Sequence, residues 1–170
     1  MLDLDNTLWG GVLGEDGLEG IALGDDYPGS CFRAFQREVL RWRRAGVLIA
    51  IASKNNVDDA LEALREHPEM QLGPQDLDHL EIHWEPKPVS VQRILETFNI
   101  GQEAVLFVDD NPRERDAVAQ AFPRIRLFDF PDEPLEIVPR FRRLPWPVFG
   151  ATSEEDGRRA ELQRQQSHRV

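Results

Sequence analysis

The stretch that decides the fold is MLDLDNTL at residues 1–8, where apolar residues lead into Asp3 and Asp5. A short apolar run that ends in polar residues is typical of a strand buried on both faces of a parallel sheet. Asp3 and Asp5 are two residues apart, so their side chains share one face while the chain stays extended. Only two residues precede Asp3, fewer than a central strand usually has. We therefore expect a truncated central strand, whose true start lies upstream or which belongs to an excised domain.

The rest of the chain alternates between strand and helix patterns. Further strands are predicted over 47–52 (VLIAIA), 104–108 (AVLFV) and 126–128. Apolar residues at helical spacing predict helices over 32–45, 57–66, 89–98 and 113–122. This alternation predicts an α/β domain with a central parallel sheet flanked by helices. We assign residues 1–150 to that domain and residues 151–170 to a polar C-terminal tail or solvated helix.

Composition and charge narrow the possible functions. The 170 residues are enough for one domain, and 41% hydrophobic with 30% charged residues is a normal soluble balance. No apolar run is long enough to cross a bilayer and no signal peptide is apparent, so we expect no membrane contact. The net charge of −11 argues against binding nucleic acid. A single cysteine, Cys31, excludes an internal disulfide and fits a reducing, cytoplasmic location.

Polar residues gather after the predicted strands, at the edge where open parallel sheets bind ligands. They are Asp3 and Asp5 after the first strand, Ser53, Lys54 and Asn55 after the second, Asp109 and Asp110 after the third, and Lys87 in a loop before a helix. Crowded carboxylates repel one another unless a cation is present, and Mg²⁺ prefers oxygen ligands. A single aspartate after a strand is more often a helix cap. The coincidence of all these residues instead favours a phosphoryl-transfer site with a nucleophile, a metal and a lysine.

These residues resemble the motifs of the haloacid dehalogenase (HAD) superfamily, which implies a HAD-like Rossmannoid fold. DLDNTL at 3–8 looks like the first motif, Ser53 the second, Lys87 the third and Asp109 with Asp110 the fourth, in the same order. Longer phrases resemble the FkbH-like group, HAD subfamily IIIC. They are DLDNTLWGG (3–11), SKNN (53–56), WEPK (84–87) and DDNPRER (109–115).

The resemblance implies catalytic roles. Asp3 would attack phosphorus to form a phospho-aspartate, and Asp5 would act first as general acid and then as general base. Ser53 would hydrogen-bond a phosphoryl oxygen, while Lys87 would balance the charge of the nucleophile and the phosphate. Mg²⁺ would be held by the Asp3 carboxylate, the Asp5 backbone carbonyl and Asp110, with Asp109 close behind.

Four further residues are candidates for substrate binding. They are Thr7, Trp9, Lys54 and Asn55. Thr7 is expected mainly to brace its loop, whereas Trp9 would line a flap and contact the substrate.

The segment 8–29 is rich in glycine and predicts a small β-hairpin flap, which is too small to form a helical cap. An essentially capless, open site suits a macromolecular partner. FkbH-like proteins take a glyceryl unit from 1,3-bisphosphoglycerate and load it onto an acyl carrier protein, so the resemblance implies both as partners. The alternative is a capless HAD phosphatase that acts on a small phosphorylated substrate.

Two departures from the subfamily bear on glyceryl transfer. Ala52 stands where many members have a cysteine before the Ser-Lys-Asn motif, and Ser90 stands where asparagine is expected. The only thiol is Cys31, and a lone cysteine beside Phe32 is more often inert packing than a reactive group. Lys54, Arg113 and Arg115 are candidates for a basic rim that would face an acidic carrier protein. Neither substitution affects the phosphoryl chemistry.

Two non-catalytic interpretations are weaker. A receiver-like phospho-acceptor needs its acceptor aspartate after a middle strand, where this chain has Ser53. A degenerate, non-catalytic module that binds a carrier protein would usually have lost Asp3 or Lys87, and both are present.

Overall fold

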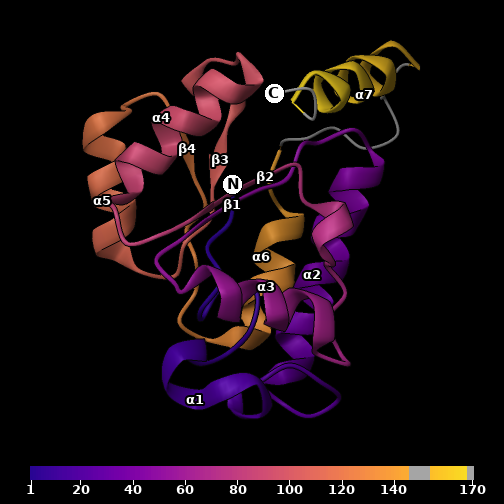
Figure 1. Ribbon diagram of the computed structural model, residues 1–170, viewed down its shortest axis with the longest axis vertical. Helices are drawn as coiled ribbons and strands as arrows, with labels where there is room; N and C mark the ends of the chain where they lie inside the picture. Colours follow the sequence, from indigo (N-terminus) through magenta and orange to yellow (C-terminus); the bar gives the residue numbers. More distant parts are fainter. Residues whose placement is uncertain (146–153, 168–170) are drawn as a thin grey trace.

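The computed structural model describes residues 1–145 and 154–167 (Figure 1). The boundary expected between residues 150 and 151 lies outside the described residues, as do 152–153 and 168–170 of the expected tail. The helices are α1 (Leu13–Gly20), α2 (Gly29–Arg44), α3 (Val57–Glu66), α4 (Lys87–Phe98), α5 (Pro112–Ala121), α6 (Ile137–Arg142) and α7 (Glu154–Ser167). The strands are β1 (Ala50–Ser53), β2 (His79–Ile82), β3 (Leu106–Phe107) and β4 (Arg126–Leu127). Short 3₁₀ turns lie at Pro74–Asp76, Gln102–Ala104 and Pro134–Glu136.

Two parallel strand pairs are joined by the segment at residues 1–3. β1 pairs with β2 and β3 pairs with β4, both in parallel. Leu2 forms parallel bridges to Ile51 of β1 and to Val108 just after β3. The strand order is therefore β2, β1, residues 1–3, β3, β4. This confirms the predicted parallel sheet and the central position of a short first segment.

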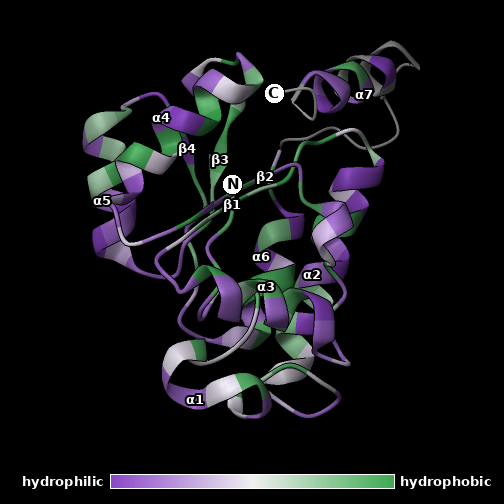
Figure 2. Cartoon of the chain, viewed as in Figure 1, coloured by the Kyte–Doolittle hydropathy of each residue, from purple (hydrophilic) through white to green (hydrophobic). Residues whose placement is uncertain are grey.

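Side chains that alternate along the strands divide the core between two faces. Ile51 and Leu106 pack in one cluster with residues of α2, α3 and α6. Ala50 and Phe107, their chain neighbours, pack on the other face, Ala50 with α4 and Phe107 with both α4 and α5. Figure 1 shows α4 and α5 on one side of the sheet and α2 and α6 on the other. Apolar residues concentrate on the strands between these helices (Figure 2). The result is a three-layer α/β domain.

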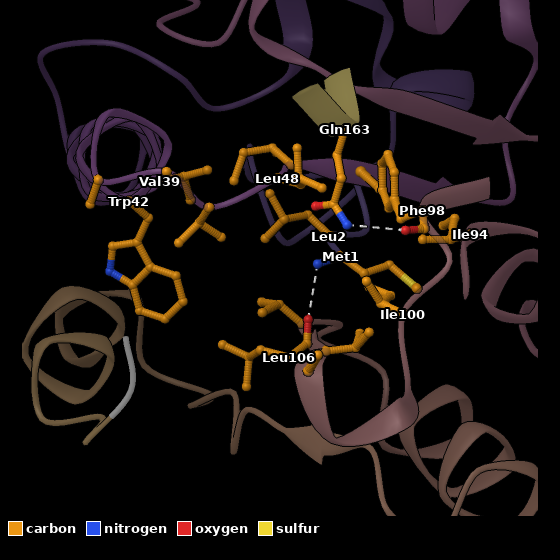
Figure 3. A pocket seen from close by; sticks show the side chains of 18 of the residues that line it. Met1, Leu2, Val39, Trp42, Leu48, Ile94, Phe98, Ile100, Leu106 and Gln163 are labelled. Carbon is orange, nitrogen blue, oxygen red and sulfur yellow. Dashed lines mark hydrogen bonds between the residues drawn. The ribbon is translucent and has the colours of Figure 1, made fainter. Parts of the chain in front are cut away.

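The amino ends of the strands border an apolar cavity of about 490 Å³ (Figure 3). Trp42, Phe98 and Leu106 are among the residues that line it. The Met1 amino group donates a hydrogen bond to the Leu106 carbonyl at 2.9 Å. Burial lowers the pKa of this amino group to about 5. Gln163 of α7 reaches the same cavity and donates to the Phe98 carbonyl at 3.3 Å.

The expected β-hairpin flap over 8–29 is not what the segment forms. It holds the short helix α1, and its residues form isolated bridges, a parallel one between Asp5 and Trp9 and an antiparallel one between Gly10 and Ala22. Gly17 has φ +72° and interrupts the helix. The glycines that suggested hairpin turns instead allow this interruption and a close approach of Gly10 to Ala22.

Three elements were not predicted, namely α1, β2 and α6. β2 has an alternating polar sequence, HLEI, and lies at the edge of the sheet beyond β1. Its Glu81 is buried because His79, His83 and Arg93 surround the carboxylate. An ion-paired glutamate in an edge strand conceals the apolar signal on which strand prediction depends.

Residues 154–167 of the expected C-terminal tail form a helix, α7. Arg164 pairs with the buried Asp78 at 2.9 Å and also donates to the Val47 carbonyl. None of the helices in the described ranges is long and apolar enough to cross a membrane.

Candidate active site

The carboxyl ends of the strands bring a lysine between two aspartates. Lys87 Nζ lies 3.0 Å from Asp3 Oδ1 and 3.0 Å from Asp109 Oδ2. The same ammonium donates a short hydrogen bond to the Ala52 carbonyl at the end of β1. Only 3% of the Lys87 side chain and none of the Asp109 side chain is exposed. Residues 3, 87 and 109, far apart in the sequence, therefore form one buried charge cluster, as predicted.

Burial and neighbouring charges shift the protonation of this cluster. Burial, supported by the charge of Asp109 and opposed by Lys87, raises the pKa of Asp3 to about 7. Burial alone would lower the pKa of Lys87, but Asp3 and Asp109 outweigh it and raise that pKa. The pKa of Asp110 is also raised, by burial and by the charge of Asp109. The carboxylates thus carry more negative charge than one lysine can balance, which favours a second cation.

Three carboxylates could provide the ligands for that cation. One oxygen from each of Asp3, Asp109 and Asp110 lies within 4.8 Å of the others. Hard oxygen ligands at such spacing fit Mg²⁺. Asp109 is oriented by the Asn111 backbone N–H at 2.9 Å as well as by Lys87. The donor set therefore fits a magnesium ion.

Asp5 lines the same cavity as Asp3, Lys87 and Asp109, and three donors hold its carboxylate. The Trp9 indole N–H and the Leu13 backbone N–H both donate to Oδ1 at 3.0 Å, and the Asn55 amide donates to Oδ2 at 3.0 Å. Trp9 is fully buried, so it fixes Asp5 and does not line the flap surface as expected. Asn55, expected to bind substrate, is buried and likewise holds Asp5. Leu13 was missed, because nothing in the sequence marks a backbone donor that α1 supplies.

A tight turn after Asp5 shapes the mouth of the site. Asn6 has φ +56°, and its side-chain oxygen accepts from the Gly11 N–H at 2.8 Å. Gly11 has φ +90°, and a Cβ there would lie 2.6 Å from Asp16 Oδ2, so glycine is required. Thr7 is buried and exchanges hydrogen bonds of 3.2 Å with Asp110, through the carboxylate and the backbone N–H. Thr7 therefore braces the loop, as predicted.

The hydroxyl of Ser53 is a buried polar group without a hydrogen-bond partner among the described residues. Buried polar groups are almost always paired, so an unpaired hydroxyl at a ligand edge suits a ligand oxygen. A cavity of about 190 Å³ lies over the cluster, and Lys54, Glu114 and Asn111 help to line it. Lys54 pairs with Glu114 at 2.9 Å, a partner that the sequence did not suggest.

Residues tied to glyceryl transfer lie elsewhere. Cys31 is half-buried near the start of α2, burial raises the pKa of its thiol, and it does not line the catalytic cavity. Ser90 is buried, and its hydroxyl lies 3.1 Å from His83 Nε2. Arg115 donates to the carbonyls of Asp109 and Asp110, so it supports the loop and is not a free basic rim.

No known family profile and no curated protein matches the chain. A similar solved structure is the N-terminal part of the protein BF1531 from Bacteroides fragilis, which contains a phosphatase domain and is complexed with Mg. The two are 38% identical with a TM-score of 0.82, and the similarity covers 85% of this chain and 39% of that one. This chain therefore spans about two fifths of its neighbour's length. The chain is therefore similar in fold to a phosphatase domain complexed with Mg, and its own clustered aspartates could hold a metal ion.

Proposed function

We propose that the chain is a Mg²⁺-dependent phosphatase that hydrolyses a small phosphate ester through a phospho-aspartate on Asp3. The observation that carries this proposal is the buried Asp3–Lys87–Asp109 cluster, in which Lys87 Nζ lies 3.0 Å from both carboxylates. The Mg-bound phosphatase domain of the neighbour supports the same activity. The unpaired Ser53 hydroxyl supports a phosphoryl oxygen as its ligand.

Each residue has a defined task in the proposed reaction. An Asp3 oxygen attacks phosphorus, the phosphorus–oxygen bond to the leaving group breaks, and Asp5 gives the leaving oxygen a proton. Water then attacks the phospho-aspartate and passes a proton to Asp5, which releases phosphate and regenerates Asp3. Lys87 balances charge on Asp3 and the phosphate. Mg²⁺ would be held by Asp3, Asp110 and the Asp5 backbone carbonyl, beside Asp109, and when bound it neutralises charge on the phosphate oxygens.

The three donors on Asp5 matter for this assignment. They hold the Asp5 carboxylate through partners other than Lys87, which contacts Asp3 and Asp109. Two acids at one strand end thus occupy different surroundings, which is the arrangement that lets one act as nucleophile and the other move protons.

The test is phosphate release from p-nitrophenyl phosphate with Mg²⁺, comparing wild type with Asp3→Asn. We expect Mg²⁺-dependent release in the wild type and a loss of about five to six orders of magnitude in the variant, as when an enzyme loses its nucleophile. Chelation of the metal should stop release, and added Mg²⁺ should restore it. Release that persists in Asp3→Asn at the wild-type rate would contradict the proposal.

A second candidate is glyceryl transfer from 1,3-bisphosphoglycerate to an acyl carrier protein. The FkbH-like sequence stretches around Asp3, Ser53, Lys87 and Asp109 favour it. Ala52 and the position of Cys31 weigh against it, because neither places a thiol in the catalytic cavity. The test is the mass of a holo carrier protein after incubation with chain, Mg²⁺ and 1,3-bisphosphoglycerate. A glyceryl mass gain that Asp3→Asn abolishes would establish transfer, and its absence with phosphate released would leave the phosphatase.

A further inference from the structure

A second cavity lies beside the catalytic one. It has a volume of about 430 Å³, more than twice that of the catalytic cavity at about 190 Å³. Asn6 and Asp110 line both, so the two cavities share a wall at the mouth of the site. The remaining walls come from the segment around α1, from Pro28 and Phe32 at the start of α2, and from residues 130–137. The two cavities are therefore neighbours, with Asn6 and Asp110 between them.

The walls of the second cavity combine apolar surface with negative charge. Phe32, Phe130 and Ile137 form buried apolar walls. The charged lining residues are Asp16, Asp110 and Asp132, and none of the lysines, arginines and histidines that the structure describes lines the cavity. One Asp16 oxygen accepts from the Val12 N–H at 2.8 Å, and Asp132 is exposed.

The cations of the site are used elsewhere. Lys87 contacts Asp3 and Asp109, and Lys54 pairs with Glu114, and both lysines line the catalytic cavity only. Because Asp110 is one of the proposed Mg²⁺ ligands, a second phosphate in the larger cavity would meet the carboxylates of Asp16 and Asp132, with no described lysine, arginine or histidine in its walls. Like charges at such range disfavour binding, whereas an ammonium group would be attracted.

We propose that this second cavity binds the leaving group of the substrate and selects phosphate monoesters whose leaving group is positively charged or neutral over bisphosphates. This inference rests on the proposed phosphatase function and deepens it. The substrate class that follows is the monophosphate ester of an amino alcohol or an uncharged alcohol. Asp132 is the specificity residue most open to test, because it is exposed and belongs to no part of the catalytic machinery.

The test uses three esters of equal chain length, aminopropyl phosphate, propyl phosphate and propanediol bisphosphate, with Mg²⁺. For the wild type we expect kcat/KM to fall in that order, by roughly fivefold at each step, which corresponds to one modest charge interaction. Asp132→Lys should reverse the order of the two charged esters. Asp132→Asn should fall between. Asp116→Lys, the same charge change at an exposed site on α5 that lines neither cavity, should keep the wild-type order.

A binding measurement separates this inference from the proposed function, since it requires no turnover. Calorimetry with Mg²⁺-bound protein should show aminopropylphosphonate binding several-fold tighter than propylphosphonate in the wild type and not in Asp132→Lys. Equal binding of the two phosphonates, or a wild-type preference for the bisphosphate, would overturn the selectivity even if p-nitrophenyl phosphate is hydrolysed through Asp3. Tighter aminopropylphosphonate binding without any Asp3-dependent hydrolysis would uphold the cavity and overturn the phosphatase.

Discussion

The two ends of the sheet make an instructive comparison. At the carboxyl end, Lys87 lies between Asp3 and Asp109, and its pKa is raised. At the amino end, the main-chain nitrogen of Met1 donates to the Leu106 carbonyl beside an apolar cavity. The same apolar strands run between the two ends. The residues that follow the strands, and not the strands themselves, decide which end can hold charge.

The largest expected effect on stability comes from removing Lys87. Lys87→Met leaves Asp3 and Asp109 buried without a cation, so the free energy of unfolding should fall by about 3–5 kcal/mol. Urea unfolding in metal-free buffer measures the change. Lys54→Met is the matched control, because Lys54 is more exposed and its pair with Glu114 should contribute only about 0–1 kcal/mol. Equal losses of unfolding free energy in the two variants would show that burial does not increase the contribution of Lys87 to stability.

The pH dependence of stability sharpens the comparison further. The pKa of Asp3 is about 7 in the folded chain against 3.8 for the ordinary carboxyl, so its ionisation opposes folding. Without metal, its contribution should reduce stability as pH rises from about 4 to about 7, by a few kcal/mol at most. Asp110 should contribute in the same direction, since its pKa is also raised.

Two measurements check this contribution. The unfolding free energy of Asp3→Asn minus that of wild type should increase between pH 4 and 7 in metal-free buffer. Saturating Mg²⁺ should remove the increase, because the metal binds the ionised carboxylate. A difference that stays constant with pH would contradict the raised pKa.

A smaller effect is expected from the support of Asp5. Trp9→Phe keeps most of the buried ring but removes one of three donors to the carboxylate. The loss of one such hydrogen bond should lower kcat about tenfold with KM nearly unchanged. Trp42→Phe is the control, since Trp42 stacks on Phe141 at the other end of the sheet, with ring centroids 4.2 Å apart. If Trp42→Phe lowers kcat equally, the effect comes from a loss of core packing and not from the lost hydrogen bond to Asp5.

The smallest change concerns the apolar end. Leu48 is half-buried in the wall of the 490 Å³ cavity, so Leu48→Ala should cost only about 1 kcal/mol of unfolding free energy. Steady-state kinetics should not change, because no catalytic residue touches that wall. A change in kcat would show that the two ends of the sheet are coupled.

The sequence predicts most of what positions the site. Helix α3 begins and ends where its apolar spacing indicated, at 57 and 66, and the acids after the strands meet Lys87 as expected. These successes rest on local periodicity and on the common edge of parallel strands. The coarse architecture follows from the same two rules.

The failures have a different cause. Trp9 and the glycines beside it read equally well as an exposed flap, and only the packed structure turns the indole inward onto Asp5. The second cavity was not foreseen, because its walls come from two segments about a hundred residues apart. The partner of Glu81 in β2 was likewise invisible, since ion pairing across neighbouring elements leaves no periodic signal.

Arg115 gives the loop after β3 a property that its acids alone do not have. Its guanidinium holds two successive carbonyl groups, those of Asp109 and Asp110, while one carboxylate turns to Lys87 and the other to Thr7. The backbone of both acids is therefore held by a residue of α5. Each residue of a helix turns the chain by about 100°, so removing a single residue between 111 and 114 would swing this anchor away. The number of residues between the acid pair and Arg115 therefore matters to the site as much as the identity of these residues.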